Sequence, residues 1–268
     1  MKEIKAIVIG AAGKMGSRII HIIHETPSIS LYRAVERPDH PSIGTDIGEV
    51  IGLGKMGIPL EGDLKKTGGD VIINFTNPKT SLESLEFAKE TGSAIVIGTT
   101  GLSPEQMEKV RDLSKGVRCV FTPNMSVGMN VMFRIVQEVA RVLGPEYDIE
   151  IFEAHHRLKK DSPSGTAVKL GELIAKAVGR EFGKVGVYGR KGMVGERTKE
   201  EIGMQVIRAG DIVGEHTVLF GGIGERLEII HRAHSRDNFA RGAIRAALWV
   251  VNQPNGLYDM QDVLGLKG

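Results

Sequence analysis

The most restrictive feature of the sequence is a series of short apolar segments that alternate with helical patterns over the first 125 residues. Five of these segments are predicted strands, at 5–10, 29–36, 70–76, 93–100 and 117–123. Amphipathic stretches such as SLESLEFAKETG and SPEQMEKVRDLSKG separate several of them, and Ser103 is expected to cap the second. Apolar strands that alternate with helices are typical of a parallel sheet covered on both faces. The sequence therefore predicts a doubly wound α/β fold.

The pattern changes after the segment NMSVGMN, residues 124–130, where strands and helices no longer alternate regularly. We expect a helix at 131–142, a strand at 148–156, a helix at 166–178 and strands at 204–212, 215–221 and 226–233. Strands in succession indicate an antiparallel or mixed sheet. The last helical pattern, at 237–251, is expected to pack on the first domain. The prediction is a Rossmann-type domain at 1–126 completed by 236–268, and a second α+β domain with a mixed open sheet at 127–235.

The composition argues against several kinds of partner. Hydrophobic residues make up 41% of the chain and charged residues 25%, which allows a normal core, and the formal net charge is +2. A charge so close to balance gives no indication of a nucleic-acid or membrane partner. The single cysteine, Cys119, excludes an intrachain disulfide. Because the N-terminal apolar run is also too short for a signal peptide, we expect a cytoplasmic protein.

The segment IVIGAAGKMGSRII puts Gly10, Gly13 and Gly16 between a predicted strand and a predicted helix. Glycines there allow a sharp turn, a close approach of a pyrophosphate to backbone amides, and tight packing of the helix on its strand. The spacing is GxxGxxG rather than the commoner GxGxxG, so it is weak evidence alone. Glu36 strengthens it, because a carboxylate at the end of the second strand can bind the adenosine ribose hydroxyls. Arg37 could instead pair with the 2′-phosphate of NADPH. The alternative to a cofactor site is an ordinary glycine turn beside an exposed Glu-Arg pair.

Two further loops, GTTG at 98–101 and TPNM at 122–125, each follow a predicted parallel strand. Cofactors and substrates of open sheets gather at the carboxyl ends of such strands. Taken alone, each loop is explained about as well by an ordinary turn.

The stretch EAHHRLKKDSPSGTA, residues 153–167, admits three interpretations. Glu153, His155 and Asp161 could be metal ligands, but adjacent histidines point to opposite faces of a strand and the spacing fits no strong zinc pattern. The segment could also be a solvated basic loop. The third interpretation is an anionic substrate site: Ser164 caps a helix whose first amides meet an anion, and a histidine donates a proton. We favour this third interpretation and expect no metal.

The same stretch resembles the signature of the dihydrodipicolinate reductase family, E-x-x-H-H-x-x-K-x-D-x-P-S-G-T-A with one residue of slack at the start. Other segments are similar to the family in the same order: IGAAGKMG, VIGTTG, NMSVGMNVM, RAGDIVGEHTVLF, GERLEIIHRA and GAIRAALWV. The resemblance therefore covers essentially the whole chain.

The resemblance implies roles for residues of both domains. In the second domain, His155 would be the acid/base, Lys159 a further proton donor that anchors a substrate carboxylate, and His156, Gly165 and Thr166 would bind the substrate. In the first domain, the cofactor would be NADH or NADPH, held by Gly10, Ala11, Ala12, Gly13, Lys14, Met15, Glu36, Arg37, Gly98, Thr99, Thr100, Thr122, Pro123, Asn124 and Met125. Asn74, Ser162 and Met125 depart from the commonest family residues, and Met125 stands where an aromatic side chain is frequent.

The activity that the resemblance implies is NAD(P)H-dependent reduction of the cyclic dicarboxylate 4-hydroxy-tetrahydrodipicolinate, in lysine and diaminopimelate biosynthesis. It also implies a homotetramer assembled through the second domain, which would bind the substrate. Two alternatives are a non-catalytic NAD(P)-binding regulator and a different dehydrogenase of a small carboxylate. An aldehyde dehydrogenase would need a nucleophilic cysteine, whereas Cys119 lies inside an apolar predicted strand and is expected to be a core residue.

Overall fold

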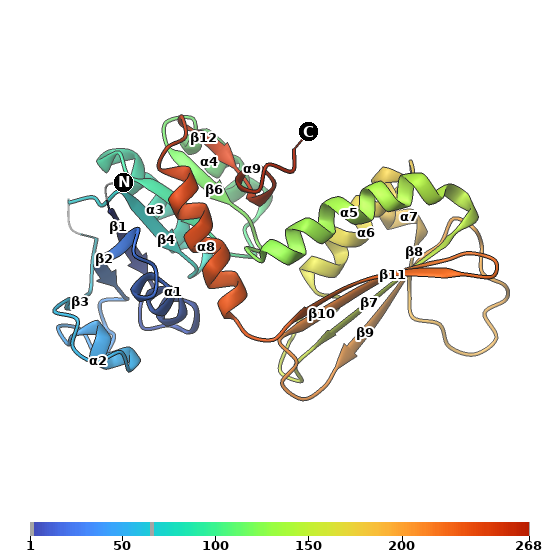
Figure 1. Cartoon of the computed structure of the whole chain (residues 1–268), viewed down its shortest axis with the longest axis horizontal. Helices are drawn as coiled ribbons and strands as arrows, with labels where there is room; N and C mark the ends of the chain where they lie inside the picture. The colour runs from blue at the N-terminus through green and yellow to red at the C-terminus, as the bar shows by residue number, and fades with distance from the viewer. Residues whose placement is uncertain (1–2, 65–66, 268) are drawn as a thin grey trace. The chain divides into compact units, whose positions relative to one another are not determined.

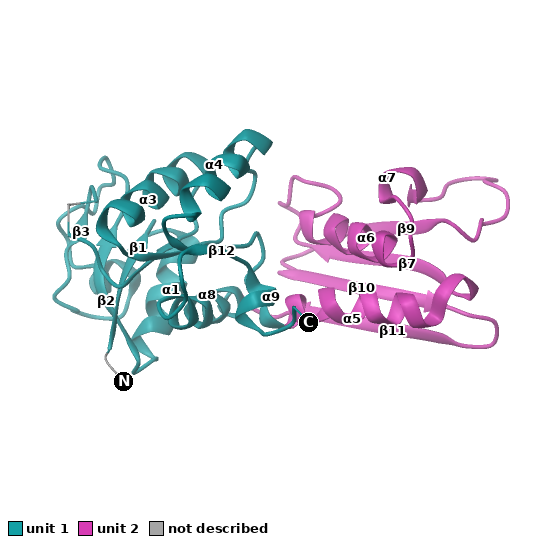
Figure 2. Ribbon diagram, turned by 90° about the horizontal axis from the view of Figure 1, so that it is seen from above, with its two compact units in different colours: residues 1–127, 236–268 teal, residues 128–235 magenta. Residues whose placement is uncertain are grey.

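The computed structural model describes residues 3–64 and 67–267. The chain forms two compact units (Figure 2): residues 1–127 with 236–268 form unit 1, and residues 128–235 form unit 2. The chain thus leaves unit 1 after residue 127 and returns to it at residue 236. Among the described residues, no helix combines the length and the apolar character needed to cross a membrane.

The described part of unit 1 contains a parallel sheet of seven strands (Figure 1). In spatial order they are β12 (Gly256–Tyr258), β6 (Arg118–Phe121), β5 (Ala94–Ile97), β4 (Val71–Asn74), β1 (Ile4–Ile9), β2 (Ile29–Val35) and β3 (Leu60–Glu61). The direction in which strands are added reverses between β1 and β4. In doubly wound sheets, ligands bind beside such a reversal, at the carboxyl ends of the strands. The predicted Rossmann-type fold is confirmed.

Helices cover both faces of this sheet. They are α1 (Lys14–His24), α2 (Ile47–Ile51), α3 (Pro78–Thr91), α4 (Pro104–Ser114), α8 (Asp237–Val250) and α9 (Met260–Val263). Ala6 and Val8 of β1 pack in the core formed with α1 and α8, whereas Ile7 and Ile9 pack in the core formed with α3 and α4. Burial on both faces explains why this strand reads as a continuous apolar run.

Two local predictions in unit 1 are confirmed. The Ser103 hydroxyl accepts a hydrogen bond from Gln106 N, and the Gln106 side chain accepts one from Ser103 N, which makes a capping box at the start of α4. Cys119 is fully buried, and burial raises the pKa of its thiol to about 12. A thiol so hard to ionise is a core residue and no nucleophile.

Unit 2 contains a mixed sheet of five strands in its described residues. In spatial order they are β11 (Arg226–Ala233), β10 (Gly214–Gly221), β7 (Asp148–His155), β9 (Ile202–Arg208) and β8 (Gly186–Tyr188). β10 is antiparallel to β7 and β11, while β9 is parallel to β7 and β8. The mixed sheet predicted for this part of the chain is confirmed.

One face of the unit 2 sheet is covered by helices. α5 (Val127–Leu143) and α6 (Gly165–Ala177) lie on the same side of the strands (Figures 1 and 2), followed by the short α7 (Phe182–Val185), and the turn η1 (Gly144–Glu146) connects α5 to β7. Along β7 every second residue, from Ile149 through Ile151 and Glu153 to His155, is buried. The first two of these pack with α5 and α6, so Glu153 and His155 project to the helix-covered side.

Several predicted boundaries were wrong. The strand expected at 93–100 ends at Ile97, and the next residue is a glycine packed against Phe75, since a Cβ at position 98 would lie 2.2 Å from that ring. The helix expected at 131–142 begins at Val127. The short elements α2, β3, α7, β8 and β12 were not predicted, since segments of two to five residues carry no readable periodicity.

Candidate active site

The glycine loop connects β1 to α1 through backbone geometry. Gly10 has φ +73°, a left-handed conformation that favours glycine. Gly13 is the N-cap of α1 and provides no side-chain hydrogen bond to the first turn. At Gly16 a Cβ would lie 2.0 Å from the carbonyl oxygen of Gly10, so the helix contacts the loop directly. The loop can thus present its amides, and those of the first turn, to a phosphate group.

Glu36 links this loop to the end of β2. Its carboxylate accepts hydrogen bonds from Ala12 N at 3.2 Å and from Arg37 N at 3.1 Å. A carboxylate fixed at this position is suited to the ribose hydroxyls of a dinucleotide. The Arg37 side chain is 66% exposed, with Nε 3.5 Å from Asp39 Oδ1, so it is available to a charged ligand group in solvent.

The loops after β5 and β6 reach the same edge of the sheet as the glycine loop. Thr99 is buried, with its hydroxyl 2.7 Å from the Ser81 hydroxyl. Asn124 Oδ1 accepts a hydrogen bond from Ser126 N at 3.0 Å, which holds the second loop. The Met125 side chain is 1% exposed and packs in the core with α8. A cofactor contact at residue 125 therefore has to use the backbone rather than the thioether.

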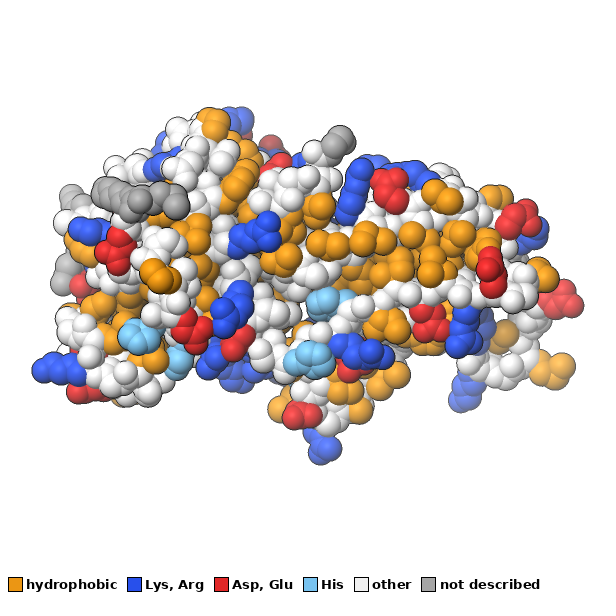
Figure 3. Space-filling view, in the orientation of Figure 1, with side chains coloured by type: hydrophobic (Ala, Val, Ile, Leu, Met, Phe, Trp, Pro, Cys, Tyr) orange, Lys and Arg blue, Asp and Glu red, His pale blue; other side chains and the backbone are white. Residues whose placement is uncertain are grey.

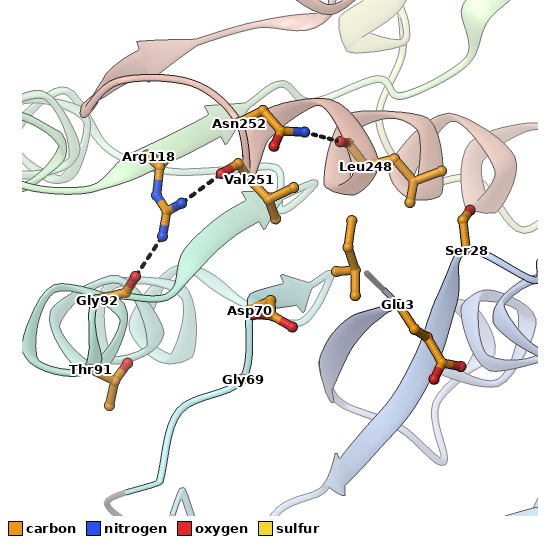
Figure 4. A pocket seen from close by; sticks show the side chains of 11 residues that line it. Glu3, Ser28, Gly69, Asp70, Thr91, Gly92, Arg118, Leu248, Val251 and Asn252 are labelled. Atoms are coloured by element: carbon orange, nitrogen blue, oxygen red, sulfur yellow. Dashed lines mark hydrogen bonds between the residues drawn. The ribbon is translucent and has the colours of Figure 1, made fainter. Parts of the chain in front are cut away.

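A separate cavity of about 690 Å³ opens in unit 1 near the amino ends of the strands (Figure 4). It includes Ile4, Asp70 and Arg118, which lie at the starts of β1, β4 and β6 or directly before them. The Arg118 guanidinium donates to the carbonyl oxygens of Val251 and Gly92, at 2.7 and 2.6 Å. The cavity contains none of the predicted cofactor residues, and its arginine is committed to the backbone.

In unit 2, the most tightly organised polar cluster surrounds Glu153. Its carboxylate is buried and accepts hydrogen bonds from Arg208 Nη1 and Nη2 at 2.8 and 2.9 Å and from Ser164 N at 2.9 Å. It also lies 2.6 Å from His155 Nδ1. Burial opposes ionisation, but the hydrogen bonds from His155, Arg208 and Ser164 outweigh it and lower the pKa of Glu153 to about 2. Glu153 is therefore an anion at neutral pH.

A second buried histidine, His216 of β10, lies against His155. The two rings are 5.3 Å apart in an edge-to-face arrangement, and His216 Nε2 is 3.3 Å from the Ser164 hydroxyl. Nδ1 of His216 meets no hydrogen-bond partner among the described residues. Burial, together with the positive charge that His155 can carry, lowers the pKa of His216 to about 3. His216 is thus uncharged beside His155.

The remaining predicted residues of unit 2 follow β7 and lead to α6. Lys159 is 22% exposed in its side chain, and its Nζ lies 3.0 Å from Asp161 Oδ1. Ser164 caps α6 as predicted, with its hydroxyl accepting from Ala167 N at 3.2 Å. A Cβ at Gly165 would meet none of the described heavy atoms within 4 Å, so the start of α6 is open to a ligand.

Histidine and cationic side chains come together on the surface of unit 2, over the part where Figure 1 labels β10 (Figure 3).

The metal-site interpretation of Glu153, His155 and Asp161 has no support, because the Glu153 carboxylate pairs with Arg208 and the Asp161 carboxylate with Lys159. Across residues 3–64 and 67–267 no group of three His, Cys, Asp or Glu side chains is placed to hold a metal ion. His155 instead lies between the buried Glu153 carboxylate and the His216 ring.

Three participants were not predicted as part of this cluster. Glu153 had been considered only as a metal ligand, although its i, i+2 spacing from His155 places both side chains on one face of a strand. Arg208 is the register partner of His155 across β7 and β9, which requires knowledge of the strand pairing. His216 carries no motif of its own, and its position against His155 likewise depends on the sheet order.

Comparison with known proteins decides the family. The family models for the N-terminus and the C-terminus of dihydrodipicolinate reductase match residues 4–125 and 128–264. The chain belongs to the dihydrodipicolinate reductase family. It is 59% identical over 266 residues to the 4-hydroxy-tetrahydrodipicolinate reductase of Syntrophus aciditrophicus (strain SB), covering 98% of this chain and 99% of the relative. It is 55% identical to the protein of the same name from Geotalea uraniireducens (strain Rf4), over 98% and 100% of the two chains.

A solved structure supports the fold. Dipicolinate-bound dihydrodipicolinate reductase from Paenisporosarcina sp. TG-14 matches with a TM-score of 0.74 and 24% identity, over 97% of this chain and 98% of that one. The family assignment confirms that the chain is an NAD(P)H-dependent oxidoreductase rather than a non-catalytic regulator. The glycine loop and the Glu36 carboxylate are the groups of unit 1 that fit such a cofactor.

Proposed function

We propose that this chain reduces 4-hydroxy-tetrahydrodipicolinate to tetrahydrodipicolinate in lysine and diaminopimelate biosynthesis. The overall change removes water from the ring, adds a hydride at C4 and adds a proton. NAD(P)H is oxidised to NAD(P)⁺. The observation that carries the proposal is that one buried carboxylate, Glu153, contacts both His155 and Ser164 N, the N-cap of α6, whose start is open.

The substrate carboxylates are bound at the start of α6. Backbone N–H groups in the first turn of a helix have no intrahelical acceptor and attract anions, which suits Gly165 and Thr166. Lys159 adds a mobile cation, and a substrate carboxylate competes with Asp161 for it. His156 contributes a further donor from the residue after β7. A flat dicarboxylate ring is thereby oriented by contacts at its two acidic groups.

The dinucleotide is held in unit 1 by Gly10 to Met15, by Glu36 and Arg37, and by the loops after β5 and β6 at 98–100 and 122–125. When bound, the reduced nicotinamide supplies the hydride. The loop amides meet the pyrophosphate, and Glu36 meets the adenosine ribose. Because Glu36 suits a free ribose and Arg37 a 2′-phosphate, both NADH and NADPH are substrates.

The proton comes from His155 or Lys159. After hydride addition at C4 the ring carries enamine-like electron density, which must be protonated to complete the product. His155 is held by Glu153 at Nδ1, so its Nε2 is the nitrogen left to exchange a proton with the ring. Lys159 is the second candidate donor, because its ammonium group carries a proton and can bind a substrate carboxylate.

Oligomer contacts are proposed for the open face of the unit 2 sheet. Phe152, Ile207 and Ile230 are 37%, 51% and 43% exposed, and their strand registers place them on the face away from α5 and α6. Exposed apolar side chains grouped on one sheet face are typical of a subunit interface. We propose a homotetramer formed through this face, in the cytoplasm. Light scattering of Phe152→Asp would show smaller species than the wild type, whereas an unchanged mass would contradict this interface.

The test of the activity follows NAD(P)H absorbance while a synthase generates the unstable substrate from pyruvate and aspartate semialdehyde. His155→Ala and Lys159→Ala are expected to lower kcat by about 10²–10⁴-fold. Lys160→Ala, an exposed neighbour in the same loop, should retain the wild-type rate within about two-fold. Pyridine-2,6-dicarboxylate, the dipicolinate named in the Paenisporosarcina structure, should compete with the substrate. No oxidation by folded wild type would refute the function, and active variants would refute the proton donors.

A further inference from the structure

Glu153 is a buried carboxylate whose contacts connect separate parts of the candidate site. One oxygen, Oε2, lies 2.6 Å from His155 Nδ1 and accepts a hydrogen bond from Arg208 Nη1 at 2.8 Å. The other, Oε1, accepts hydrogen bonds from Ser164 N at 2.9 Å and from Arg208 Nη2 at 2.9 Å. The residue is 1% exposed, so it presents no surface to a substrate. Glu153 can therefore influence the reaction only through the groups that its carboxylate binds.

We propose that Glu153 is the positioning residue of the reaction: it fixes the tautomer and orientation of His155 and ties that ring to the start of α6. This inference rests on the proposed function, in which His155 gives a proton and the amides of α6 bind the substrate carboxylate. Because one carboxylate binds both His155 and Ser164 N, the proton donor and the anion-binding helix end keep a fixed relation.

The tautomer follows from the chemistry of the contact. An ionised carboxylate accepts hydrogen bonds only, so His155 must carry a proton on Nδ1. Nε2 is then the nitrogen that changes protonation. A Cβ at position 214 would lie 3.1 Å from Nε2, so glycine at that position leaves room beside it. Glu153 thus directs proton exchange to one side of the ring.

Arg208 keeps the carboxylate itself in place. Its guanidinium binds both oxygens of Glu153 and also donates to the carbonyl oxygen of Asp161 at 2.7 Å. The Arg208 guanidinium therefore joins β9 to the loop that carries Lys159. A bidentate pair of this kind fixes geometry better than a single contact does.

Charged and titratable groups face the His155 ring from several elements. They are Glu153 of β7, His216 of β10 and, beyond His216, His231 of β11; Arg208 of β9 binds the same carboxylate as the ring. Glu153 makes a contact of 2.6 Å with the ring. Removing the charge of Glu153 therefore changes the electrostatic surroundings of the proton donor.

The test uses Glu153→Gln, which keeps the size of the side chain and one acceptor oxygen but removes the charge. We expect kcat to fall about 10–100-fold with KM changed less than about three-fold, as for other orienting partners of histidine. The pH profile of kcat should also differ from that of wild type, because the charge beside the proton donor is gone. In ¹⁵N NMR of the histidine rings, the Nδ1–H tautomer of His155 should dominate in wild type and become mixed in the variant.

A matched control is Glu150→Gln. Glu150 lies on the same strand, on the opposite face, and is held by Arg190 and Arg197 without a histidine contact among the described residues. Its variant should leave the pH profile and the His155 signals unchanged. Glu153→Asp, which retains the charge on a shorter side chain, should recover the wild-type pH profile in part.

Two results would overturn the proposal. A Glu153→Gln protein with wild-type tautomer and pH profile, but lower stability, would make Glu153 a purely structural residue. If that variant does not fold, wild-type NMR decides: a His155 ring protonated on Nε2 alone is incompatible with the proposed contact. The ring spectra need no turnover, so loss of the proposed reductase activity in wild type would leave this measurement independent.

Discussion

The two loops proposed to bind ligands each lie between the end of a strand and the start of a helix, but they are stabilised by different groups. In unit 1 the turn after β1 is made by glycine backbone, with Gly13 as an N-cap without a side-chain bond. In unit 2 the path from β7 to α6 is held by buried ionised side chains, and Ser164 caps the helix with its hydroxyl. The first loop should therefore be sensitive to added atoms and the second to changes of charge.

The largest effect on stability is expected at Arg208. Arg208→Met leaves the Glu153 carboxylate buried without its bidentate partner, and breaking a buried ion pair in this way typically costs about 3–5 kcal/mol. Arg190→Met is the matched control, because Glu150 keeps its contact with Arg197. Urea unfolding at neutral pH gives the free energy of unfolding of both variants. An equal decrease in this free energy in the two variants would show that charge is no more important in this loop than elsewhere in the sheet.

Gly16→Ala should be the next most damaging change. The added Cβ would lie 2.0 Å from the Gly10 carbonyl oxygen, so the loop must move. Overpacking of this kind typically destabilises by about 1–3 kcal/mol, and we expect NADH affinity to fall by about 100-fold, because the loop amides shift. Gly183→Ala is the control, since a Cβ there meets none of the described atoms within 4 Å. Normal NADH binding by Gly16→Ala would show that the close contact is dispensable.

A smaller effect is expected from protonation of His216. Its pKa is about 3 in the folded chain against an ordinary value of 6.5, so the unfolded chain binds more protons between these limits. The stability from keeping His216 neutral is complete above about pH 6.5 and is lost as the pH falls toward 3. His216→Gln should flatten the decline in unfolding free energy between pH 7 and 5, unlike His24→Gln on the exposed end of α1. Parallel curves for wild type and His216→Gln would contradict this.

The smallest effect is expected at Arg37, where unit 1 uses a side chain rather than backbone. Its guanidinium is exposed and weakly held by Asp39, so solvent screens its interactions. Arg37→Ala should weaken NADPH binding about two- to five-fold and leave NADH binding unchanged. Fluorescence titration with both cofactors gives the ratio of the NADPH and NADH dissociation constants, and Arg111→Ala on α4 is the control. An equal loss for the two cofactors would remove Arg37 from recognition of the 2′-phosphate.

This contrast also explains what could be predicted from the sequence. Gly10, Gly13, Gly16 and Glu36 act close together in the chain or at a fixed distance along a strand–helix–strand unit, so the motif predicts their arrangement. The family signature around His155 and Ser164 is also contiguous. By contrast, Arg208 and His216 reach the site through pairings of β7 with β9 and with β10. Local periodicity contains no information on such pairings, and a mixed sheet allows several orders.

The order of synthesis gives the return of the chain to unit 1 a further consequence. α8 contributes Ala240, Ala243, Ile244, Ala246, Ala247 and Val250 to the core beside α1, although it follows the whole of unit 2. On the ribosome, the first 127 residues therefore emerge with one apolar sheet face covered by α1 but not yet by α8. Unit 2 is continuous and has its own core, so it can fold as soon as it emerges. The part of the protein that is made first is thus the part that is completed last.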